Sequence, residues 1–289
     1  MKKTIFTGAA VALVTPFLED GGVNYKKLEE LIEYQIANST DAIVACGTTG
    51  EASTLTDDEH KEIIRFTVEK VAGRIPVIAG TGSNDTAYSL ELSQYAKEVG
   101  ADAQLQVTPY YNKTTQKGLI KHFTYIADRV DLPMILYNVP GRTGMNILPE
   151  TYGELCKHPN IVAAKEANGD VAALVKTMDI CGDELDIYSG DDGLIVPMMS
   201  LGAKGVISVL SNIKPQETHD ICRLFMEGKV AESAKMQKAF NNLINALFIE
   251  TNPIPVKTAM NVLGYEVGEC RMPLCEMSEA NLEKLKKYL

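Results

Sequence analysis

The sequence predicts an α/β fold, a closed (β/α)8 barrel of the TIM type with a C-terminal helical appendage. Short apolar, β-branched segments recur at fairly regular intervals along the 289 residues, each followed by a longer stretch of helical periodicity. This alternation is typical of parallel strands joined by crossover helices, and eight such units favour a closed barrel. We expect the barrel over residues 1–229 and helices packed on it over residues 230–289.

The eight expected strands are short apolar segments. They are Ala9–Val14, Ala42–Cys46, Pro76–Gly80, Ala103–Thr108, Met134–Asn138, Ile161–Lys165, Ile187–Gly190 and Gly205–Val209. The first lies in a start that superficially resembles a secretory signal, with two lysines ahead of an apolar run. Thr4, Thr7 and Gly8 interrupt that run. Pro16 closes it and no small-residue cleavage site follows, so we expect a strand there.

Capping signals mark several of the expected helices. Asn24 precedes an apolar stripe, and Thr56 with Glu59 has the spacing of a capping box before another. Pro215 suits a first helical turn. From about Val230 the strand pattern stops and helical patterns, broken by prolines and a glycine, continue to the C-terminal residue.

Composition and charge exclude several classes of protein. Hydrophobic residues make up 45% of the chain and charged residues 23%, as in a packed globular protein. A net charge of −10 without a Lys/Arg cluster argues against nucleic acid, and no apolar run approaches the roughly 18 residues of a membrane span. The six cysteines form no CxxC pair and the four histidines show no ligand spacing. We therefore expect reduced thiols, no metal and a cytoplasmic location.

A lysine ends the sixth expected strand, on the side where barrel enzymes carry their reacting groups. Ala163 and Lys165 share one face of that strand, which directs the lysine into the barrel mouth. In an apolar pocket an ammonium loses solvation, its pKa falls, and the neutral amine becomes a nucleophile towards a carbonyl carbon. From this segment alone, a lysine that reaches back to water is an equal alternative.

The fifth expected strand and the loop after it contain a tyrosine and an arginine that can take part in a reaction. Tyr137 lies on the strand next to the lysine, where its phenol can shuttle protons. Arg142, in a loop flanked by Gly141 and Gly144, can hold a carboxylate with its planar fork. Taken separately, Tyr137 suits a buried core position and Arg142 suits a surface charge. Taken together, with two glycines in the same loop, they favour a functional site.

Two further strand ends are unusually polar or aromatic. The run from Gly47 to Glu51 reads GTTGE, whose two hydroxyls and backbone N–H groups form a cradle for a small carboxylate. An ordinary βα turn with an N-cap is the alternative. After the fourth strand, Tyr110 and Tyr111 are two expected exposed aromatics, which suit a site, a hydrophobic interface, or both.

In this order the segments resemble the N-acetylneuraminate lyase superfamily and, within it, the dihydrodipicolinate synthase family. The resemblance runs from Thr7–Phe17 to Gly205–Val209 and continues more loosely through Asn252–Lys257. GTTGE and the strand-six lysine are superfamily features. The run Tyr137–Gly144 is the more discriminating one, because sialic acid lyases lack its Arg142.

The resemblance implies a class I, Schiff-base-forming lyase. It would condense pyruvate with L-aspartate 4-semialdehyde to 4-hydroxy-tetrahydrodipicolinate, the committed step towards diaminopimelate and lysine, without metal or organic cofactor. The usual assembly of the family is a homotetramer, a pair of tight dimers. Another pyruvate-dependent aldolase, such as a sialic acid or 2-keto-3-deoxy sugar acid lyase, remains open, as does a non-catalytic barrel acting as a binding protein.

The resemblance also implies roles for individual residues. Lys165 would form the imine with pyruvate, and Tyr137, Thr48 and Tyr111 would form a proton relay, the last reaching in from a neighbouring subunit. The implied substrate-binding residues are Thr49 for the pyruvate carboxylate, Arg142 for the carboxylate of the aldehyde, and the carbonyls of Gly190 and Ile207.

A regulatory site is implied as well, because many bacterial members are inhibited by lysine at the tight dimer interface. The corresponding residues here are Ala52, Ser53, Asp57, His60, Asn84, Tyr88 and Tyr110. Lysine-sensitive members carry a glutamate where this chain has Tyr88 and a histidine where it has Asp57. Loss of a charge-assisted contact costs about 1.5–3 kcal/mol, so we expect little or no inhibition by lysine.

Overall fold

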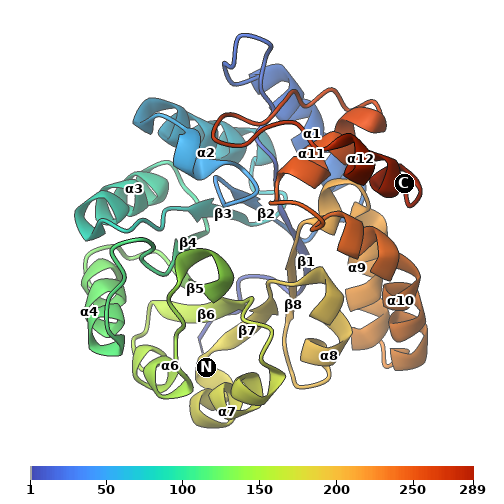
Figure 1. Ribbon diagram of the computed structural model, residues 1–289. Helices are drawn as coiled ribbons and strands as arrows, with labels where there is room; N and C mark the ends of the chain where they lie inside the picture. Colours follow the sequence, from blue (N-terminus) through green and yellow to red (C-terminus); the bar gives the residue numbers. More distant parts are fainter. Residues whose placement is uncertain (1) are drawn as a thin grey trace.

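The structure, a computed structural model, describes residues 2–289. Its eight parallel strands close into one barrel, in which β8 pairs with β1. The strands are β1 (Gly8–Ala12), β2 (Ala42–Ala45), β3 (Val77–Gly80), β4 (Ala103–Val107), β5 (Met134–Asn138), β6 (Ile161–Glu166), β7 (Asp186–Ser189) and β8 (Gly205–Ser208). Figure 1 shows them in the middle of the molecule with the helices around them. The predicted barrel is confirmed.

The strand ends differ from the predicted ones by at most two residues, and local geometry explains the difference at the mouth. Strand β2 stops at Ala45 because the next residue, Cys46, has a φ of 54° and cannot continue a β ladder. Strand β6 runs one residue beyond Lys165 to Glu166, which pairs with Asn138 and Ser189 of the neighbouring strands.

The helices alternate with the strands and begin where the capping signals predict. They are α1 (Tyr25–Ala37), α2 (Asp57–Val71), α3 (Thr86–Glu98), α4 (Gln116–Ala127), α5 (Pro140–Thr143), α6 (Pro149–Leu155), α7 (Val171–Cys181), α8 (Ile195–Met199), α9 (Pro215–Met226), α10 (Val230–Ala246), α11 (Ile254–Val262) and α12 (Glu279–Lys286). Asn24 caps α1, Thr56 and Glu59 form the predicted capping box of α2, and Pro215 opens α9. Within residues 2–289, none of the helices is long and apolar enough for a membrane crossing.

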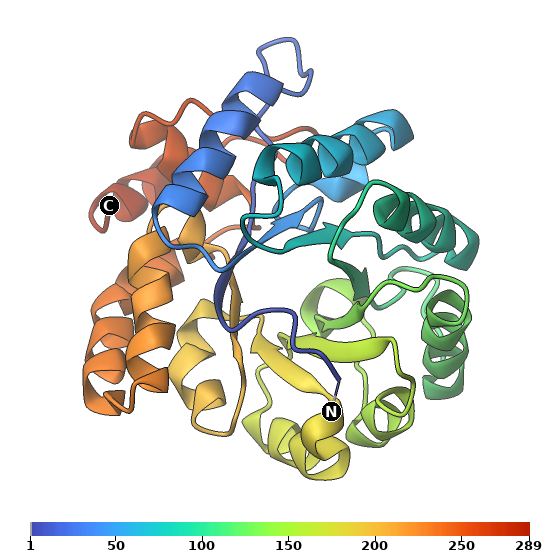
Figure 2. The ribbon, with the colours of Figure 1, turned by 180° about the vertical axis from the view of Figure 1, so that it is seen from behind.

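The amino-terminal end of the barrel is covered by the chain that precedes β1. The ring of Phe6 stacks on that of Tyr188 with centroids 4.2 Å apart, and the Tyr188 hydroxyl donates to the Phe6 carbonyl at 2.7 Å. The Lys2 ammonium donates to the Ile161 carbonyl at 2.7 Å. Figure 2 shows this segment crossing the back of the barrel. Access to the interior is therefore from the opposite end, at the carboxyl ends of the strands.

The three helices after residue 229 pack on one side of the barrel. Helix α10 packs against α8 and α9, and α11 packs against α12. Figure 1 shows α11 and the chain that follows it lying beside α1 and α2. The predicted C-terminal helices are confirmed, whereas their separation from the barrel as a unit at residue 230 stays a prediction.

Candidate active site

Lys165 projects from β6 at the barrel mouth and is almost fully buried. Only 6% of the residue is exposed, so the alternative of a lysine that reaches back to water is wrong. In the strand register Lys165 lies opposite Tyr137 of β5 on one side and Tyr188 of β7 on the other. Its Nζ lies 4.3 Å from the centroid of the Tyr137 ring. The predicted pairing of the lysine with a tyrosine on the next strand is present.

Gly190 and Ile207 come from the strands beyond β6, on the side away from Tyr137. Gly190 directly follows β7, and Ile207 lies in β8. A Cβ built on Gly190 would come within 3.2 Å of Lys165 Cε and 2.8 Å of Ala167 Cβ, so only a glycine leaves room for the lysine stem. Ile207 is buried in the barrel interior, in the same apolar cluster as Tyr137 and Ala163. Gly190 therefore lies against the lysine stem, and Ile207 lies in the barrel interior.

The GTTGE run forms a tight turn after β2. Glu51 N donates to the Thr48 carbonyl at 3.1 Å and Ala52 N donates to the Gly47 carbonyl at 3.3 Å, which leaves the amides of Thr48 and Thr49 unused by the turn itself. Glu51 has a positive φ of 56°, a conformation uncommon for residues other than glycine. Strained backbone of this kind concentrates at functional sites.

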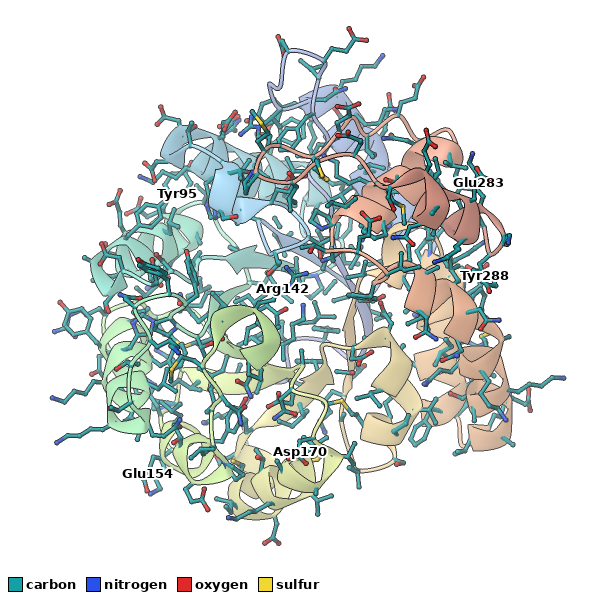
Figure 3. The ribbon with its side chains drawn as sticks, viewed as in Figure 1. Tyr95, Arg142, Glu154, Asp170, Glu283 and Tyr288 are labelled. Carbon is teal, nitrogen blue, oxygen red and sulfur yellow. The ribbon has the colours of Figure 1, made fainter. Side chains whose placement is uncertain are left out.

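Arg142 lies in a single helical turn, α5, and not in the predicted loop. The turn begins at Pro140 and is capped by Gly144, which has a φ of 68°. A hydrogen bond of 2.9 Å from the Thr108 hydroxyl to the Thr143 hydroxyl ties it to the residue that follows β4. A proline at the first helical position and a glycine after the last residue favour such a turn. Arg142 itself is exposed and lies near the middle of the mouth (Figure 3).

The two tyrosines after β4 differ in exposure, which corrects the expectation that both are exposed. Tyr110 is half-buried and lines the mouth pocket. Tyr111 is 92% exposed and has a φ of 66°, so its side chain points away from its own barrel. The structure therefore does not bring Tyr111 to the other proposed relay residues within one chain.

A pocket of about 250 Å³ opens at the mouth over β2 to β5. Its lining is formed by Cys46, Gly47, Thr48, Ala52, Ser53, Gly80, Gly82, Leu105, Val107, Tyr110, Tyr137, Val139, Arg142 and Thr143. Of these residues, all within the described 2–289, Arg142 alone carries a formal charge. Thr48, Tyr137 and Arg142 are thus brought together, whereas Lys165 is not part of the lining and its Nζ lies 4.3 Å from the centroid of the Tyr137 ring. Thr49, Gly190 and Ile207 are not part of this lining.

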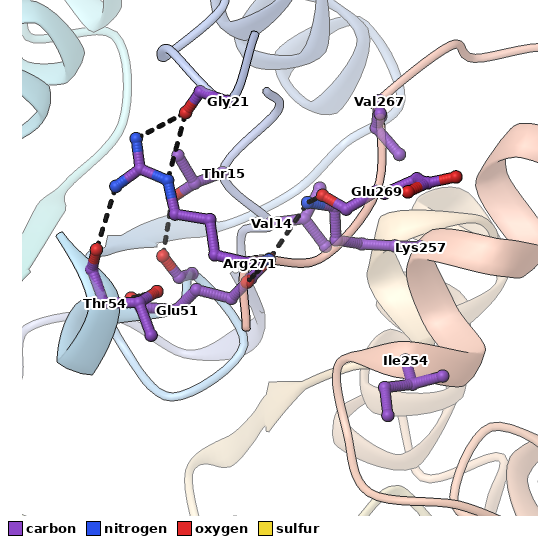
Figure 4. Close-up of polar contacts among 12 residues, drawn as sticks. Val14, Thr15, Gly21, Glu51, Thr54, Ile254, Lys257, Val267, Glu269 and Arg271 are labelled. Carbon is purple, nitrogen blue, oxygen red and sulfur yellow. Dashed lines mark hydrogen bonds and ion pairs between the residues drawn. The ribbon is translucent and has the colours of Figure 1, made fainter. Parts of the chain in front are cut away.

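Sequence reasoning missed a set of C-terminal residues that hold the GTTGE turn. The Lys257 ammonium, on a residue 1% exposed, donates to Glu51 Oε1 at 2.9 Å and to the Glu269 carbonyl at 2.7 Å. Burial lowers the pKa of Lys257, and the Glu51 charge opposes that effect. The Arg271 amide donates to Glu51 Oε2 at 2.8 Å (Figure 4). Both Glu51 oxygens are thereby occupied by groups some 200 residues away in sequence.

The Arg271 side chain extends the same network. Its guanidinium binds both oxygens of Glu59 at 2.6 and 2.7 Å and the Gly21 carbonyl at 2.6 Å, and it stacks over the Phe17 ring. The hydrogen bond from Arg271 is the main reason that the pKa of Glu59 is lowered to about 2. No motif signals these contacts in the sequence, because the partners are separated by most of the chain.

Glu166, next to the lysine, was also missed, and it lies on the opposite face of β6. Its carboxylate accepts from Asn138 Nδ2 at 3.0 Å and from the Tyr152 hydroxyl at 2.8 Å. Burial raises the pKa of Glu166, against the effect of these hydrogen bonds. The residue ties the end of β6 to β5 and α6 and so supports the lysine from behind.

Comparison with known proteins identifies the family. A model of the Dihydrodipicolinate synthetase family matches residues 5–289. The chain belongs to this family. It is 60% identical over 287 residues to 4-hydroxy-tetrahydrodipicolinate synthase of Clostridium tetani, with 99% of this chain and 97% of the relative covered.

Solved structures agree with this assignment. The chain is similar to the chloride-inhibited dihydrodipicolinate synthase of Acinetobacter baumannii complexed with pyruvate, with a TM-score of 0.96, 46% identity and coverage of 99% of this chain and 98% of that one. It is also similar to the enzyme of Cyanidioschyzon merolae with lysine bound, with a TM-score of 0.96, 40% identity and coverage of 99% and 98%.

The predicted resemblance and the predicted enzyme class are thereby confirmed. The chain is a lyase of lysine biosynthesis with 4-hydroxy-tetrahydrodipicolinate synthase activity. Of the functions that the sequence leaves open, this is the one that these relatives carry.

Proposed function

We propose that the barrel mouth condenses pyruvate with L-aspartate 4-semialdehyde through a Schiff base on Lys165. The observation that carries the proposal is a buried lysine at the end of β6, with its Nζ 4.3 Å from the centroid of the Tyr137 ring. The Lys165 amine attacks the pyruvate carbonyl, and the carbinolamine loses water to form an imine. Its protonated nitrogen is an electron sink, so the pyruvate methyl group loses a proton and becomes an enamine carbon.

The second half of the reaction forms the new carbon–carbon bond. The enamine carbon attacks the aldehyde carbon, and the aldehyde oxygen takes up a proton. The amino group of the adduct then attacks the imine carbon, which closes the ring and releases the Lys165 amine. Each step moves a proton, for which Tyr137 and Thr48, both lining the pocket, are the proposed carriers.

The two carboxylates are assigned to different groups. Thr49 and the free amides of the GTTGE turn receive the carboxylate of pyruvate, near the lysine, with the carbonyls of Gly190 and Ile207 completing that side. Arg142, the charged group of the lining, receives the carboxylate of the aldehyde. Trapping of a pyruvate adduct by borohydride, followed by a coupled assay with aspartate semialdehyde, tests the two halves separately.

Arg142→Ala should impair use of aspartate semialdehyde much more than imine formation with pyruvate. Removing a charge-assisted, bidentate contact costs about 1.5–3 kcal/mol, roughly one to two decades in apparent affinity. The measurement compares the KM for the aldehyde with the rate of borohydride trapping. Arg129→Ala is the matched control, because Arg129 follows α4 at the opposite end of the barrel and stacks over the exposed Tyr125. Equal damage to both half-reactions would assign Arg142 a different task.

Tyr111 completes the proposed relay only in an oligomer, because its own chain leaves it exposed. We propose that it reaches the site of a neighbouring subunit in a tetramer built from two tight dimers. Tyr111→Phe should lower turnover without unfolding the protein, and mixing it with Lys165→Ala should restore some activity. In a mixed dimer, one site combines an intact lysine with an intact tyrosine. If subunit exchange is verified and no activity returns, Tyr111 acts within its own chain or not at all.

Lysine should inhibit the enzyme weakly or not at all. Burial raises the pKa of Tyr88 to about 12, so its phenol is neutral near pH 7 and cannot replace a carboxylate. Asp57 is already paired with Lys61 at 2.8 Å, which is the main reason that the pKa of its carboxyl is lowered. An inhibition titration measures the effect, and Tyr88→Glu should increase sensitivity. Half-inhibition of the wild type at submillimolar lysine would contradict this expectation.

We also propose that the enzyme works in the cytoplasm, as the cysteine usage predicts. All six cysteines are free thiols in the structure, and four of them are buried. Burial raises the pKa of the Cys46 thiol above its usual range, which disfavours the thiolate form of this pocket-lining cysteine.

A further inference from the structure

Asn252 contacts both of the groups assigned to carboxylate binding. Its side-chain Nδ2 donates to Thr49 Oγ1 at 3.0 Å, and its backbone carbonyl accepts from Arg142 Nη2 at 3.1 Å. The residue comes from the C-terminal region, between α10 and α11, and only 5% of it is exposed. One residue outside the barrel strands therefore joins the GTTGE turn to α5 across the mouth.

The hydrogen bond to Thr49 controls what the threonine hydroxyl can offer a ligand. A hydroxyl has one proton to donate and lone pairs that accept. Because Asn252 Nδ2 donates to Thr49 Oγ1, the hydroxyl acts as the acceptor in that contact and its own proton remains free. A free hydroxyl proton is the group that a carboxylate recognises.

Two features set Asn252 apart from an ordinary loop residue. The residue is followed by Pro253 and Pro255, whose rings restrict φ and stiffen the segment. Among residues 2–289, no donor reaches Asn252 Oδ1, although the atom is buried. An amide that leaves a buried oxygen unpaired gives up stability, and such exceptions call for a specific explanation. Because Nδ2 faces Thr49, Oδ1 faces away from the GTTGE turn and is left without a partner among the described residues.

We propose that Asn252 is a positioning residue for the pyruvate subsite, which fixes the Thr49 hydroxyl as a hydrogen-bond donor towards the substrate carboxylate. The inference rests on the proposed function, in which Thr49 binds pyruvate. The side chain orients Thr49, whereas the contact with Arg142 uses the backbone carbonyl and survives substitution of the side chain. Side-chain variants should therefore change the KM for pyruvate and spare the KM for the aldehyde.

Two variants separate the effects of losing and of reversing the hydrogen bond. Asn252→Ala should raise the KM for pyruvate roughly threefold to tenfold, as expected for one hydrogen bond, with a smaller change in kcat. Asn252→Asp should raise it more, because an ionised carboxylate only accepts, takes the Thr49 proton for itself and repels the substrate. The Asp variant should recover part of its affinity as pH falls and its carboxyl becomes protonated.

A double-mutant cycle with Thr49→Val decides whether Asn252 acts through Thr49. Thr49→Val alone should raise the KM for pyruvate, and adding Asn252→Ala to it should raise the KM no further. The inference would be overturned if the two substitutions raised the KM for pyruvate independently, so that their fold-changes multiply in the double variant. It would also be overturned if Asn252→Ala left this KM unchanged and lowered kcat. Thermal unfolding of each variant checks that the fold is intact, and a conservative Thr49→Ser should keep the dependence on Asn252.

The outcomes also distinguish this inference from the proposed function. If pyruvate and borohydride leave Lys165 of the wild type unmodified, the Schiff-base proposal itself fails. If Lys165 is modified in the wild type and in the Asn252 variants, and the KM for pyruvate is the same in all of them, only the positioning role fails.

Discussion

Lys165→Ala should abolish trapping by pyruvate and borohydride and should lower turnover on the order of 10³-fold or more. The imine cannot form without the amine, and removing the covalent nucleophile of an enzyme leaves only the catalysis supplied by binding and by the remaining polar groups. In the wild type, borohydride should reduce the imine and attach one three-carbon adduct at Lys165, identified by peptide mass analysis. Lys165→Arg keeps the positive charge but should behave like the alanine variant.

The protein contains its own control for this experiment. Among residues 2–289, Lys165 and Lys257 are the two buried lysines, and only Lys257 is paired with a carboxylate. Its ammonium is engaged by Glu51 and by the Glu269 carbonyl, so its peptide should remain unmodified. An adduct at another position, or labelling that survives Lys165→Ala, would exclude the mechanism proposed for this barrel.

Lys257→Ala should destabilise the protein by about 3–5 kcal/mol, because it leaves the Glu51 carboxylate buried without its counter-charge. The same change should disorder the GTTGE turn, so the KM for pyruvate should rise as well. Urea unfolding followed by circular dichroism, at one protein concentration, measures the loss, since an oligomer's stability depends on concentration.

An ion pair at the surface serves as the control for the buried pair of Lys257 with Glu51. Lys286 pairs with Glu283 at 2.9 Å on the exposed face of α12, and Lys286→Ala should cost at most about 1 kcal/mol. Combining Lys257→Met with Glu51→Gln should recover part of the lost stability, because a buried pair replaced by neutral groups of similar volume is often tolerated. If Lys257→Ala costs no more than the surface variant, Glu51 finds another partner and the buried pair does not hold the turn.

The barrel and one side of its mouth follow from local sequence patterns. Alternation of apolar strands with helical stretches predicts β1 to β8, and capping residues such as Asn24 and Thr56 predict where helices begin. Period-two alternation and parallel pairing of consecutive strands predict that Lys165 and Tyr137 are neighbours, and the strand register confirms it. These patterns concern residues within one element or on adjacent strands, so they can be recognised in one sequence.

The predictions that failed concern exposure and the shape of loops. The run Pro-Gly-Arg-Thr forms a helical turn and not a loop, and a hydrogen bond between the Thr108 and Thr143 hydroxyls holds it beside the end of β4. Tyr110 and Tyr111 are adjacent in sequence, yet the left-handed backbone of Tyr111 turns one side chain out and leaves the other half-buried. The exposure of the two tyrosines depends on where the neighbouring segments lie, whereas Pro140 and Gly144 are local signals of the helical turn that the loop prediction does not use.

Local patterns in the sequence predict the barrel, the order of its strands and the strand ends to which the reacting groups are assigned. Each of these depends on the period of the hydrophobic pattern and on residue chemistry at a known position. What holds those groups in place depends on contacts between segments that are far apart in the sequence. Asn252 and Lys257 reach Thr49 and Glu51 across some 200 residues of chain. Contacts of that kind arise because barrel closure pairs β8 with β1, next to β2, and so brings the C-terminal part of the chain close to the turn that follows β2. No local sequence pattern encodes the distance between these segments.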